Sequence, residues 1–236
     1  TVEKFQRASQ TLKYAQLPTV AAVQGLALGG GCEFVMHAGK RIMALESYVG
    51  LVEAGVGLIP AGGGCKEFAG RAAEWAAQSA TPGEVFDFLQ PVFQTIAMAR
   101  VAKSAVEAID IGFARPSDTI LFNANELLFV AIREARAMAD AGWAPPLMAR
   151  GIPVAGRTGI ATFEMMLVNM KEGGMISAHD YRVARAAAVA LCGGERRSRD
   201  VYWYHLIRSA RGGVHGEPAG GREHVEHPRP ARQAAG

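Results

Sequence analysis

A short apolar run that leads into three glycines most constrains the fold of this chain. Val20–Val23 lies between Pro18 and Gly25, which is typical of a buried strand. Gly29–Gly31 follow, and Cys32–Ala38 has the pattern of a helix. Glycines let a backbone approach a ligand closely, and a helix start presents free N–H groups. A phosphate-binding loop is excluded because no Gly-Lys-Ser/Thr follows, and a dinucleotide site is excluded because the spacing is not GxGxxG.

A second glycine-rich turn, Pro60–Gly64, also precedes a predicted helix. Between the two turns Glu33 and Glu53 each lie among apolar neighbours. Burying a carboxylate is costly unless the group is paired or neutralised, and burial raises its pKa. Such carboxylates gather at functional sites. The alternatives are a first-turn helix acid for Glu33 and a solvated loop acid for Glu53, whereas Glu46 is predicted to be a turn residue between two strands.

Short strands come first along the chain and helices follow. The expected helices cover 1–16, 32–38, 63–78, 85–100, 104–111, 123–141, 158–170 and 178–191, and the expected strands cover 20–23, 41–44, 48–51 and 119–122. This order predicts an α/β core with a helical C-terminal extension.

Composition and charge exclude several classes of protein. The 236 residues are 50% hydrophobic and 20% charged, which excludes a disordered chain, and no apolar run reaches the length of a membrane span. Residues 195–236 carry eight Arg against five acids, so the net charge of +3 lies wholly there and the rest is neutral. A neutral body has no electrostatic footprint for nucleic acid. We expect 195–236 to be a disordered Arg/Gly/Pro-rich tail, and its lack of Lys is also what a frameshifted reading of GC-rich DNA would give.

The three cysteines, Cys32, Cys65 and Cys192, form no disulfide framework and no CxxC pair. A reducing compartment is therefore expected, and we predict a cytoplasmic protein without a metal site. Cys32 and Cys65 adjoin the two glycine-rich turns, where small buried packing residues are expected rather than nucleophiles.

Residues 18–68 resemble the crotonase (enoyl-CoA hydratase/isomerase) superfamily. The matching pieces are Pro-x-Val-Ala-Ala-Val-x-Gly, then Ala-Leu-Gly-Gly-Gly-Cys-Glu, then a Glu seven residues before Pro60, and then the second glycine-rich turn. More narrowly, residues 5–194 are similar to the hydratase-like module of bacterial multifunctional 3-hydroxyacyl-CoA dehydrogenase/enoyl-CoA hydratase proteins. The resemblance implies a crotonase-like ββα spiral core with a helical C-terminal extension, formed by residues 1–194.

The resemblance also implies roles for particular residues. The N–H of Gly30 would bind the thioester oxygen of an enoyl-CoA substrate. Glu33 and Glu53 would hold a water and add it across the 2,3 double bond, giving 3-hydroxyacyl-CoA in fatty-acid β-oxidation without a cofactor. Isomerising relatives usually keep one of the two acids, so the presence of both favours hydration. Ala61 stands where the family usually has a glycine whose N–H orients the water.

The chain also departs from the pattern of this family. The family's first strands, much of its coenzyme A site and its second oxyanion donor would precede residue 1, so we expect an N-terminally truncated module of low activity. An enoyl-CoA isomerase, and an inactive fragment or interaction scaffold, are the alternatives. Family members assemble through late helices, so the expected partners are an acyl-CoA substrate and further copies of the chain, with neither nucleic acid nor a membrane span.

Overall fold

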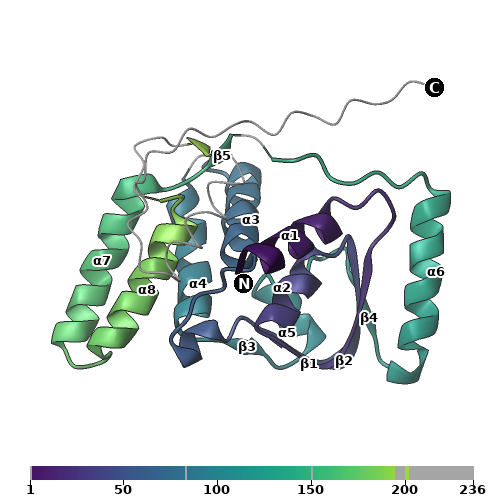
Figure 1. The fold of residues 1–236 in the computed structure, drawn as a ribbon, viewed down its shortest axis with the longest axis horizontal. Coiled ribbons are helices and arrows are strands. Elements are labelled where there is room, and N and C mark those ends of the chain that lie inside the picture. The colour runs from purple at the N-terminus through teal and green to yellow at the C-terminus, as the bar shows by residue number, and fades with distance from the viewer. Residues whose placement is uncertain (1, 83, 150, 195–199, 202–236) are drawn as a thin grey trace.

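The computed structural model describes residues 2–82, 84–149, 151–194 and 200–201 (Figure 1). The elements in chain order are α1 (Val2–Lys13), β1 (Val20–Leu28), α2 (Gly30–His37), β2 (Lys40–Gly50), the 3-10 turn η1 (Glu53–Val56), α3 (Gly64–Gln78), α4 (Val85–Ala97), β3 (Val101–Ala102), α5 (Ala105–Asp110), β4 (Thr119–Leu121), η2 (Ala124–Glu126), α6 (Leu127–Asp140), β5 (Ile152–Pro153), α7 (Gly156–Glu172), α8 (Ala178–Leu191) and β6 (Asp200–Val201).

The sheet is organised around β2. This strand pairs in parallel with β1 along one edge, while its other edge pairs in parallel with β4 and antiparallel with β3. Helix α2 makes the crossover from β1 to β2, as parallel neighbours require a connection across the sheet. The carboxyl end of β1 therefore leads directly into α2.

The prediction of two strands separated by a turn at Glu46 is wrong, because β2 runs unbroken from Lys40 to Gly50. The pairing with β1 shifts from Val23↔Met43 to Gly25↔Ser47, so β2 bulges around an exposed Glu46. The Ser47 hydroxyl lies 3.1 Å from the carbonyl oxygen of Val23 and 2.6 Å from that of Ala44. These contacts hold the bulge together, and the strand continues past the polar residues that suggested a turn.

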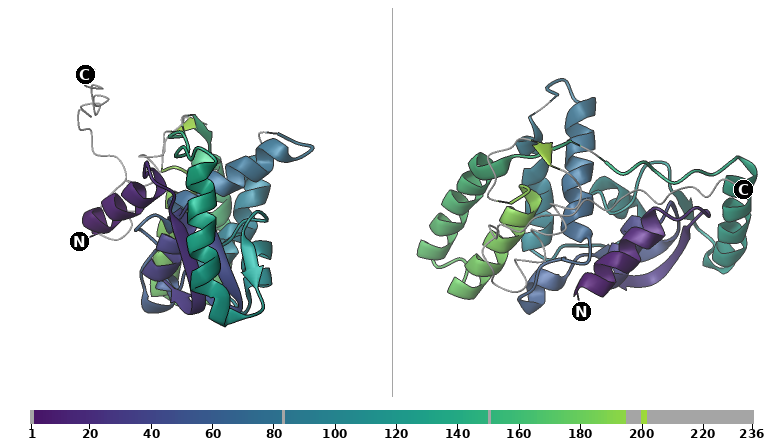
Figure 2. Two further views of the ribbon diagram at one scale, coloured as in Figure 1. Left: turned by 90° about the vertical axis from the view of Figure 1, so that its right-hand side faces the viewer. Right: turned by 45° about the horizontal axis from the view of Figure 1, so that its top comes forward.

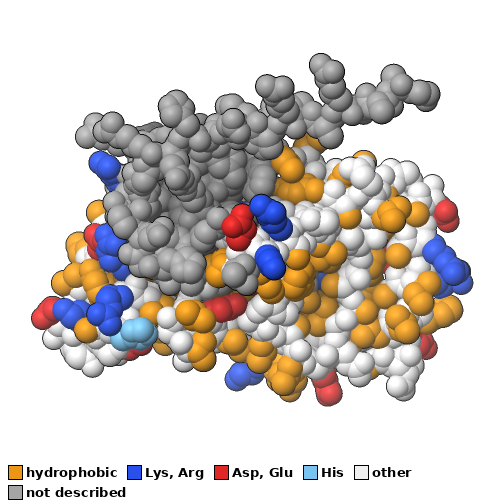
Figure 3. Space-filling view, viewed as in Figure 1, with side chains coloured by type: hydrophobic (Ala, Val, Ile, Leu, Met, Phe, Trp, Pro, Cys, Tyr) orange, Lys and Arg blue, Asp and Glu red, His pale blue; other side chains and the backbone are white. Residues whose placement is uncertain are grey.

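Helices cover both faces of the sheet. Helix α6 packs on one face through a small cluster of Ile42, Leu127 and Ala131, and α2 and α5 lie on the other (Figures 1 and 2). Hydrophobic side chains also gather on the surface over the sheet and α6 (Figure 3). Leu26 of β1 and Leu128 of α6 are exposed hydrophobic residues of these elements. Assembly into a homo-oligomer stays a prediction.

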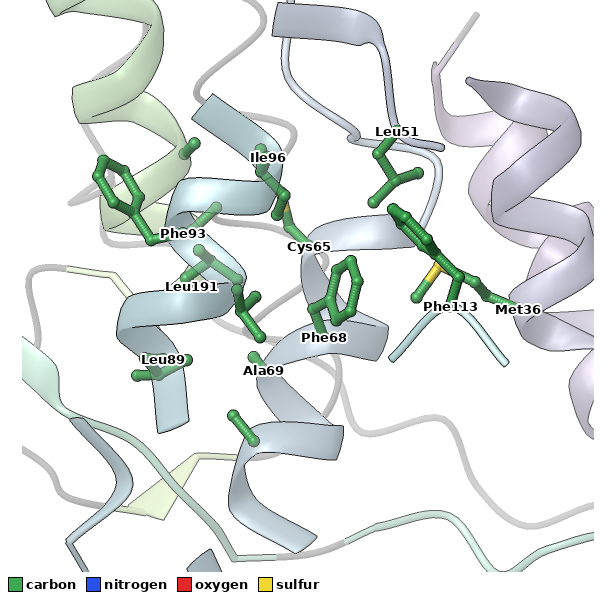
Figure 4. Packing of buried hydrophobic residues seen from close by; sticks show 14 of the residues in the cluster. Met36, Leu51, Cys65, Phe68, Ala69, Leu89, Phe93, Ile96, Phe113 and Leu191 are labelled. Carbon is green, nitrogen blue, oxygen red and sulfur yellow. The ribbon is translucent and has the colours of Figure 1, made fainter. Parts of the chain in front are cut away.

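The main core lies between α2, α3, α4 and the α7–α8 hairpin. Phe68 on α3, Phe93 on α4 and Leu191 on α8 are buried within it (Figure 4). Phe163 of α7 stacks on Phe93 with ring centroids 4.3 Å apart. Helix α8 turns alanines toward the core, and these small side chains let its backbone pack closely against α3 and α4. The predicted α/β core with a helical extension is confirmed.

Two residues of the predicted tail are described, and Asp200–Val201 pair with β5 as a short antiparallel strand. The remainder of 195–236 lies outside the described residues, so both its disorder and the frameshift stay predictions. Among the described residues, no helix has both the length and the apolar character needed to cross a membrane.

Candidate active site

The first glycine-rich turn places the start of α2 against the end of β2. The Gly29 N–H donates to the carbonyl oxygen of Gly50 at 2.8 Å, and Gly29 has a φ of 54°, which favours glycine. The first N–H groups of a helix have no partner within it. Gly30 is the first residue of α2, so its N–H lies at a helix start. The sequence predicted a helix that begins two residues later, at Cys32, and the role of the Gly30 N–H in binding stays a prediction.

Glu33 lies one turn into α2 and points into the protein. Its side chain is buried, and one carboxylate oxygen accepts a hydrogen bond from the Gly64 N–H at 2.8 Å. The pKa of Glu33 is raised to about 7, mainly by burial and also by the charge of Glu53, while the backbone N–H groups of Gly64, Gly63 and Gly62 act in the opposite direction. Glu33 therefore lies in the first turn of a helix, as the alternative prediction had it, but it is buried there and its pKa lies near neutral.

Glu53 begins the 3-10 turn η1 and is half-buried. Its Oε2 is buried without a hydrogen-bond partner among the described residues. Burial raises the pKa of Glu53. A β-carbon added to Gly29 would lie 3.4 Å from Glu53 Oε1, so this carboxyl group sits beside the turn that starts α2. Both predicted acids therefore flank the Gly29–Gly31 turn, and one has an unused oxygen.

Cys32 and Cys65 lie in the same neighbourhood and are fully buried. Burial raises the pKa of each thiol, and the charges of both Glu33 and Glu53 contribute to the same rise. A thiol is a nucleophile only when ionised. Burial is thus as predicted, and both thiols are protonated and lie near enough to the two acids to feel their charges.

Phe5 of α1 covers the site, which the sequence did not predict. A β-carbon on Gly30 would lie 3.0 Å from its ring, and one on Gly62 would lie 2.1 Å from its ring and 2.4 Å from Glu33 Oε2. The ring also packs on Phe34 with centroids 4.8 Å apart. Phe5 therefore forms an apolar wall beside Glu33.

Two polar side chains of α1 hold the second glycine-rich turn. Gln6 Nε2 donates to the carbonyl oxygen of Ala61 at 2.6 Å, and the Ser9 hydroxyl donates to that of Gly62 at 2.7 Å. Ala61 is buried, and the bond from Gln6 shows that its carbonyl faces α1. No local pattern predicts this contact, because Gln6 and Ser9 have the polar character of ordinary surface residues on a helix.

A buried polar network of His37, Glu67, Lys13 and Lys66 contacts the backbone of Glu33. The ring nitrogen Nδ1 of His37 lies 2.6 Å from the Glu33 carbonyl oxygen, and Nε2 lies 3.5 Å from Glu67 Oε1. Burial lowers the pKa of His37 to about 4, so its ring is neutral at physiological pH. Glu67 also pairs with Lys13 and Lys66. This network fixes α2 against α3 and α1.

These groups suit acid–base chemistry on a neutral or anionic intermediate. Burial raises the pKa of both carboxyl groups, that of Glu33 to about 7, and such a pair can divide the roles of acid and base. A helix start provides N–H donors for a developing negative charge. Among the described residues, no group of three or more His, Cys, Asp or Glu could hold a metal ion.

Comparison with known proteins locates the resemblance. Residues 1–82 match the family model described as enoyl-CoA hydratase/isomerase. A Bacillus subtilis (strain 168) protein named "Probable 3-hydroxyacyl-CoA dehydrogenase" is 37% identical over 194 residues, which cover 82% of this chain and 24% of that protein. The fatty acid oxidation complex subunit alpha of Colwellia psychrerythraea is 50% identical over 38 residues, covering 16% of this chain and 5% of that one.

Among solved structures, an enoyl-CoA hydratase from Bacillus anthracis is 20% identical with a TM-score of 0.43, covering 80% of this chain and 59% of that chain. The chain spans about a quarter of the length of the Bacillus subtilis relative. The predicted resemblance to the enoyl-CoA hydratase/isomerase group is confirmed over residues 1–82, which include Gly30, Glu33, Glu53 and Ala61.

Proposed function

We propose that the enoyl-CoA hydratase/isomerase-like part of this chain, residues 1–82, hydrates a trans-2-enoyl-CoA to a 3-hydroxyacyl-CoA. One observation carries the proposal: two acids with raised pKa values, Glu33 and Glu53, flank a turn that opens into a helix start. Conversion in fatty-acid β-oxidation is the metabolic setting that we propose.

The reaction needs one water and one proton exchange. The water oxygen bonds to C3 of the enoyl group while a proton leaves the water for one carboxylate, and C2 takes a proton from the other carboxyl group. Negative charge develops on the thioester oxygen, where the Gly30 N–H would stabilise it. Glu53, whose Oε2 is buried without a hydrogen-bond partner among the described residues, would be the acid that accepts the proton of the water. The proposal includes neither a cofactor nor a redox step.

The acids interact, so their two apparent pKa values belong to the pair. The charge of Glu53 raises the pKa of Glu33, which favours a state with one protonated and one ionised carboxyl group. That state is the one hydration requires, since one group must donate while the other accepts. An isomerase moves a proton between two carbons and needs one such acid.

The test follows crotonyl-CoA absorbance with the full 236-residue chain. Glu33→Gln and Glu53→Gln should each reduce the rate about 100-fold or more, the usual scale for a lost general acid or base. Glu46→Gln is the matched control, because Glu46 is an exposed acid in the β2 bulge, and it should leave the rate unchanged.

Three results would contradict the proposal. Wild-type rates from either site variant would make that acid structural. Faster conversion of a 3-enoyl-CoA than of crotonyl-CoA would assign the site to isomerisation. A well-folded chain that turns over neither substrate would be an inactive module.

A further inference from the structure

The second glycine-rich turn directs backbone N–H groups at the carboxyl group of Glu33. The Gly64 N–H donates to one of its oxygens at 2.8 Å, and the N–H groups of Gly63 and Gly62 also act on it as hydrogen-bond donors. Gly62 passes so close that an added β-carbon would lie 2.4 Å from Glu33 Oε2. Successive N–H groups directed at one point form a nest for an anion, so this turn favours the ionised form of Glu33.

The carbonyl groups of the same turn face the opposite side, toward α1. Gln6 Nε2 donates to the carbonyl oxygen of Ala61 at 2.6 Å, and the Ser9 hydroxyl donates to that of Gly62 at 2.7 Å. Helix α1 lies against α2 (Figure 1), and both side chains are buried there. The turn is therefore bonded to α1 on one side and to Glu33 of α2 on the other.

Rigid peptide units connect these two sets of bonds. A carbonyl group and the N–H of the next residue belong to one planar unit, and in a trans unit they point in opposite directions. No peptide bond in the described part of the chain is cis. The Ala61 carbonyl thus shares a unit with the Gly62 N–H, and the Gly62 carbonyl shares one with the Gly63 N–H. A bond that fixes either carbonyl on the α1 side therefore turns the linked N–H toward Glu33.

Glycine makes such anchors necessary in this turn. Gly62 and Gly63 lack a β-carbon, and Gly63 has a φ of 144°, so the peptide unit between them can rotate without a side-chain clash of its own. Rotation by half a turn would direct the Gly62 carbonyl oxygen at the Glu33 carboxylate. The bond from Ser9 opposes this rotation, because a buried carbonyl that loses its partner is unfavourable.

We propose that Gln6 and Ser9 are positioning residues that hold the N–H groups of Gly62 and Gly63 toward Glu33. The inference rests on the proposed part of Glu33 in hydration and adds two residues that act through the backbone. Burial favours the protonated form of this carboxyl group, and the N–H groups oppose that effect. The two anchors on α1 thereby keep both forms of Glu33 accessible near neutral pH.

Other titratable groups surround Glu33, and only one of them titrates close to it. The titratable side chains around it come from three elements: they are Glu53 of η1, Cys32 and His37 of α2, and Cys65 of α3. Burial raises the pKa of both thiols and lowers that of His37 to about 4, so these groups are uncharged near neutral pH. Glu53 is the group that must be separated from Glu33 in a titration.

The test is a pH titration of the Glu33 carboxyl group, followed by NMR in the full chain labelled at its glutamate carboxyl carbons. Glu33→Gln identifies the signal, and Glu53→Gln shows how much of the titration comes from coupling between the two acids. Ser9→Ala and Gln6→Met should each raise the midpoint of Glu33 by about one pH unit, the scale of one N–H bond to a charged group.

Thr95→Val is the matched control for the loss of a buried hydroxyl. Thr95 is a buried residue of α4 whose hydroxyl donates to the carbonyl oxygen of Pro91 at 2.9 Å. Its replacement should lower stability in urea unfolding by an amount similar to that of Ser9→Ala and leave the midpoint of Glu33 unchanged. A purely structural role for Ser9 would make the two variants alike.

A second measurement uses the wild-type chain, so it does not depend on the folding of a variant. The amide proton signals of Gly62 and Gly63 should shift with pH at the same midpoint as the carboxyl signal of Glu33. Amide signals that ignore this titration would overturn the proposal. So would folded Ser9→Ala and Gln6→Met variants with the wild-type midpoint, or an equal shift in Thr95→Val.

The titration needs no turnover, which separates this inference from the proposed hydration. A raised midpoint in a chain that does not convert crotonyl-CoA would support the positioning role and remove the hydratase assignment. Hydration that continues with an unchanged Glu33 midpoint in both α1 variants would retain the enzyme and overturn the positioning role.

Discussion

Replacing Gly62 by alanine should damage the site through a single added methyl group. The new β-carbon would lie 2.1 Å and 2.2 Å from two carbons of the Phe5 ring and 2.4 Å from Glu33 Oε2. Ordinary carbon contacts are about 3.5–4.0 Å, so the ring must move by about 1.4 Å or more. Overpacking of this kind typically costs about 1–3 kcal/mol.

The displaced carboxylate should also lower hydration activity, because Glu33 would lose its alignment with the Gly64 N–H. Urea unfolding gives the stability change, and crotonyl-CoA absorbance gives the rate. Gly31→Ala is the control, since a β-carbon there meets nothing within 4 Å and the residue is in α2. This change should stabilise the chain by about 0.5–1 kcal/mol.

A double-mutant cycle shows whether the Phe5 ring is the obstacle. Removing the ring in Phe5→Ala gives the new methyl group room, so Gly62→Ala should cost at least about 1 kcal/mol less in that background. Additive effects, or a Gly62→Ala variant as stable and active as the wild type, would refute the close packing described for this wall.

The remaining predictions concern pH and a buried ion pair. The pKa of Glu33 is about 7 in the folded chain and 4.5 ordinarily. Its contribution to the free energy of unfolding therefore falls by roughly 3 kcal/mol as pH rises from 4.5 to 7. Glu33→Gln should remove that loss in urea unfolding measured at several pH values. The pKa of His37 is lowered from 6.5 to about 4, so its contribution is lost as pH falls through that window, and His37→Asn should flatten the acid side of the same curve. Asp118→Asn should cost about 3–5 kcal/mol in urea unfolding, because it leaves buried Arg41 without its charged partner 2.5 Å away, whereas exposed Asp140→Asn should change little.

Helices with a complete local signal were predicted well. The expected helix at 178–191 coincides with α8, which starts at a capping box on Ser177 and Asp180. Strand β1 was predicted to end at Val23 but continues to Leu28, because Gly25–Leu28 pair with Ser47–Gly50. That extension depends on a partner strand and not on the residues themselves, so local pattern alone could not reveal it.

The candidate active site also has features that local sequence predicted and features that depend on distant contacts. Apolar neighbours in the sequence predicted the burial of Glu33 and the raised pKa of both acids. Such neighbours remove water from the carboxyl group, and this local effect disfavours its charged form. The wall formed by Phe5 and the bonds from Gln6 and Ser9 join α1 to residues more than fifty positions away. No spacing rule connects such distant positions, because packing of the whole chain creates the contact.

The central position of β2 has a consequence for synthesis of the chain. Its first edge pairs with β1, which is made earlier, but its second edge waits for β3 and for β4, which ends at Leu121. At about 5–20 residues per second, the ribosome needs roughly 4–14 s to pass from Gly50 to Leu121. An unpaired strand edge can recruit another chain during that interval. The nascent protein is therefore most exposed to misassembly before its residue 121 emerges, and a slow codon in that stretch would prolong the exposure.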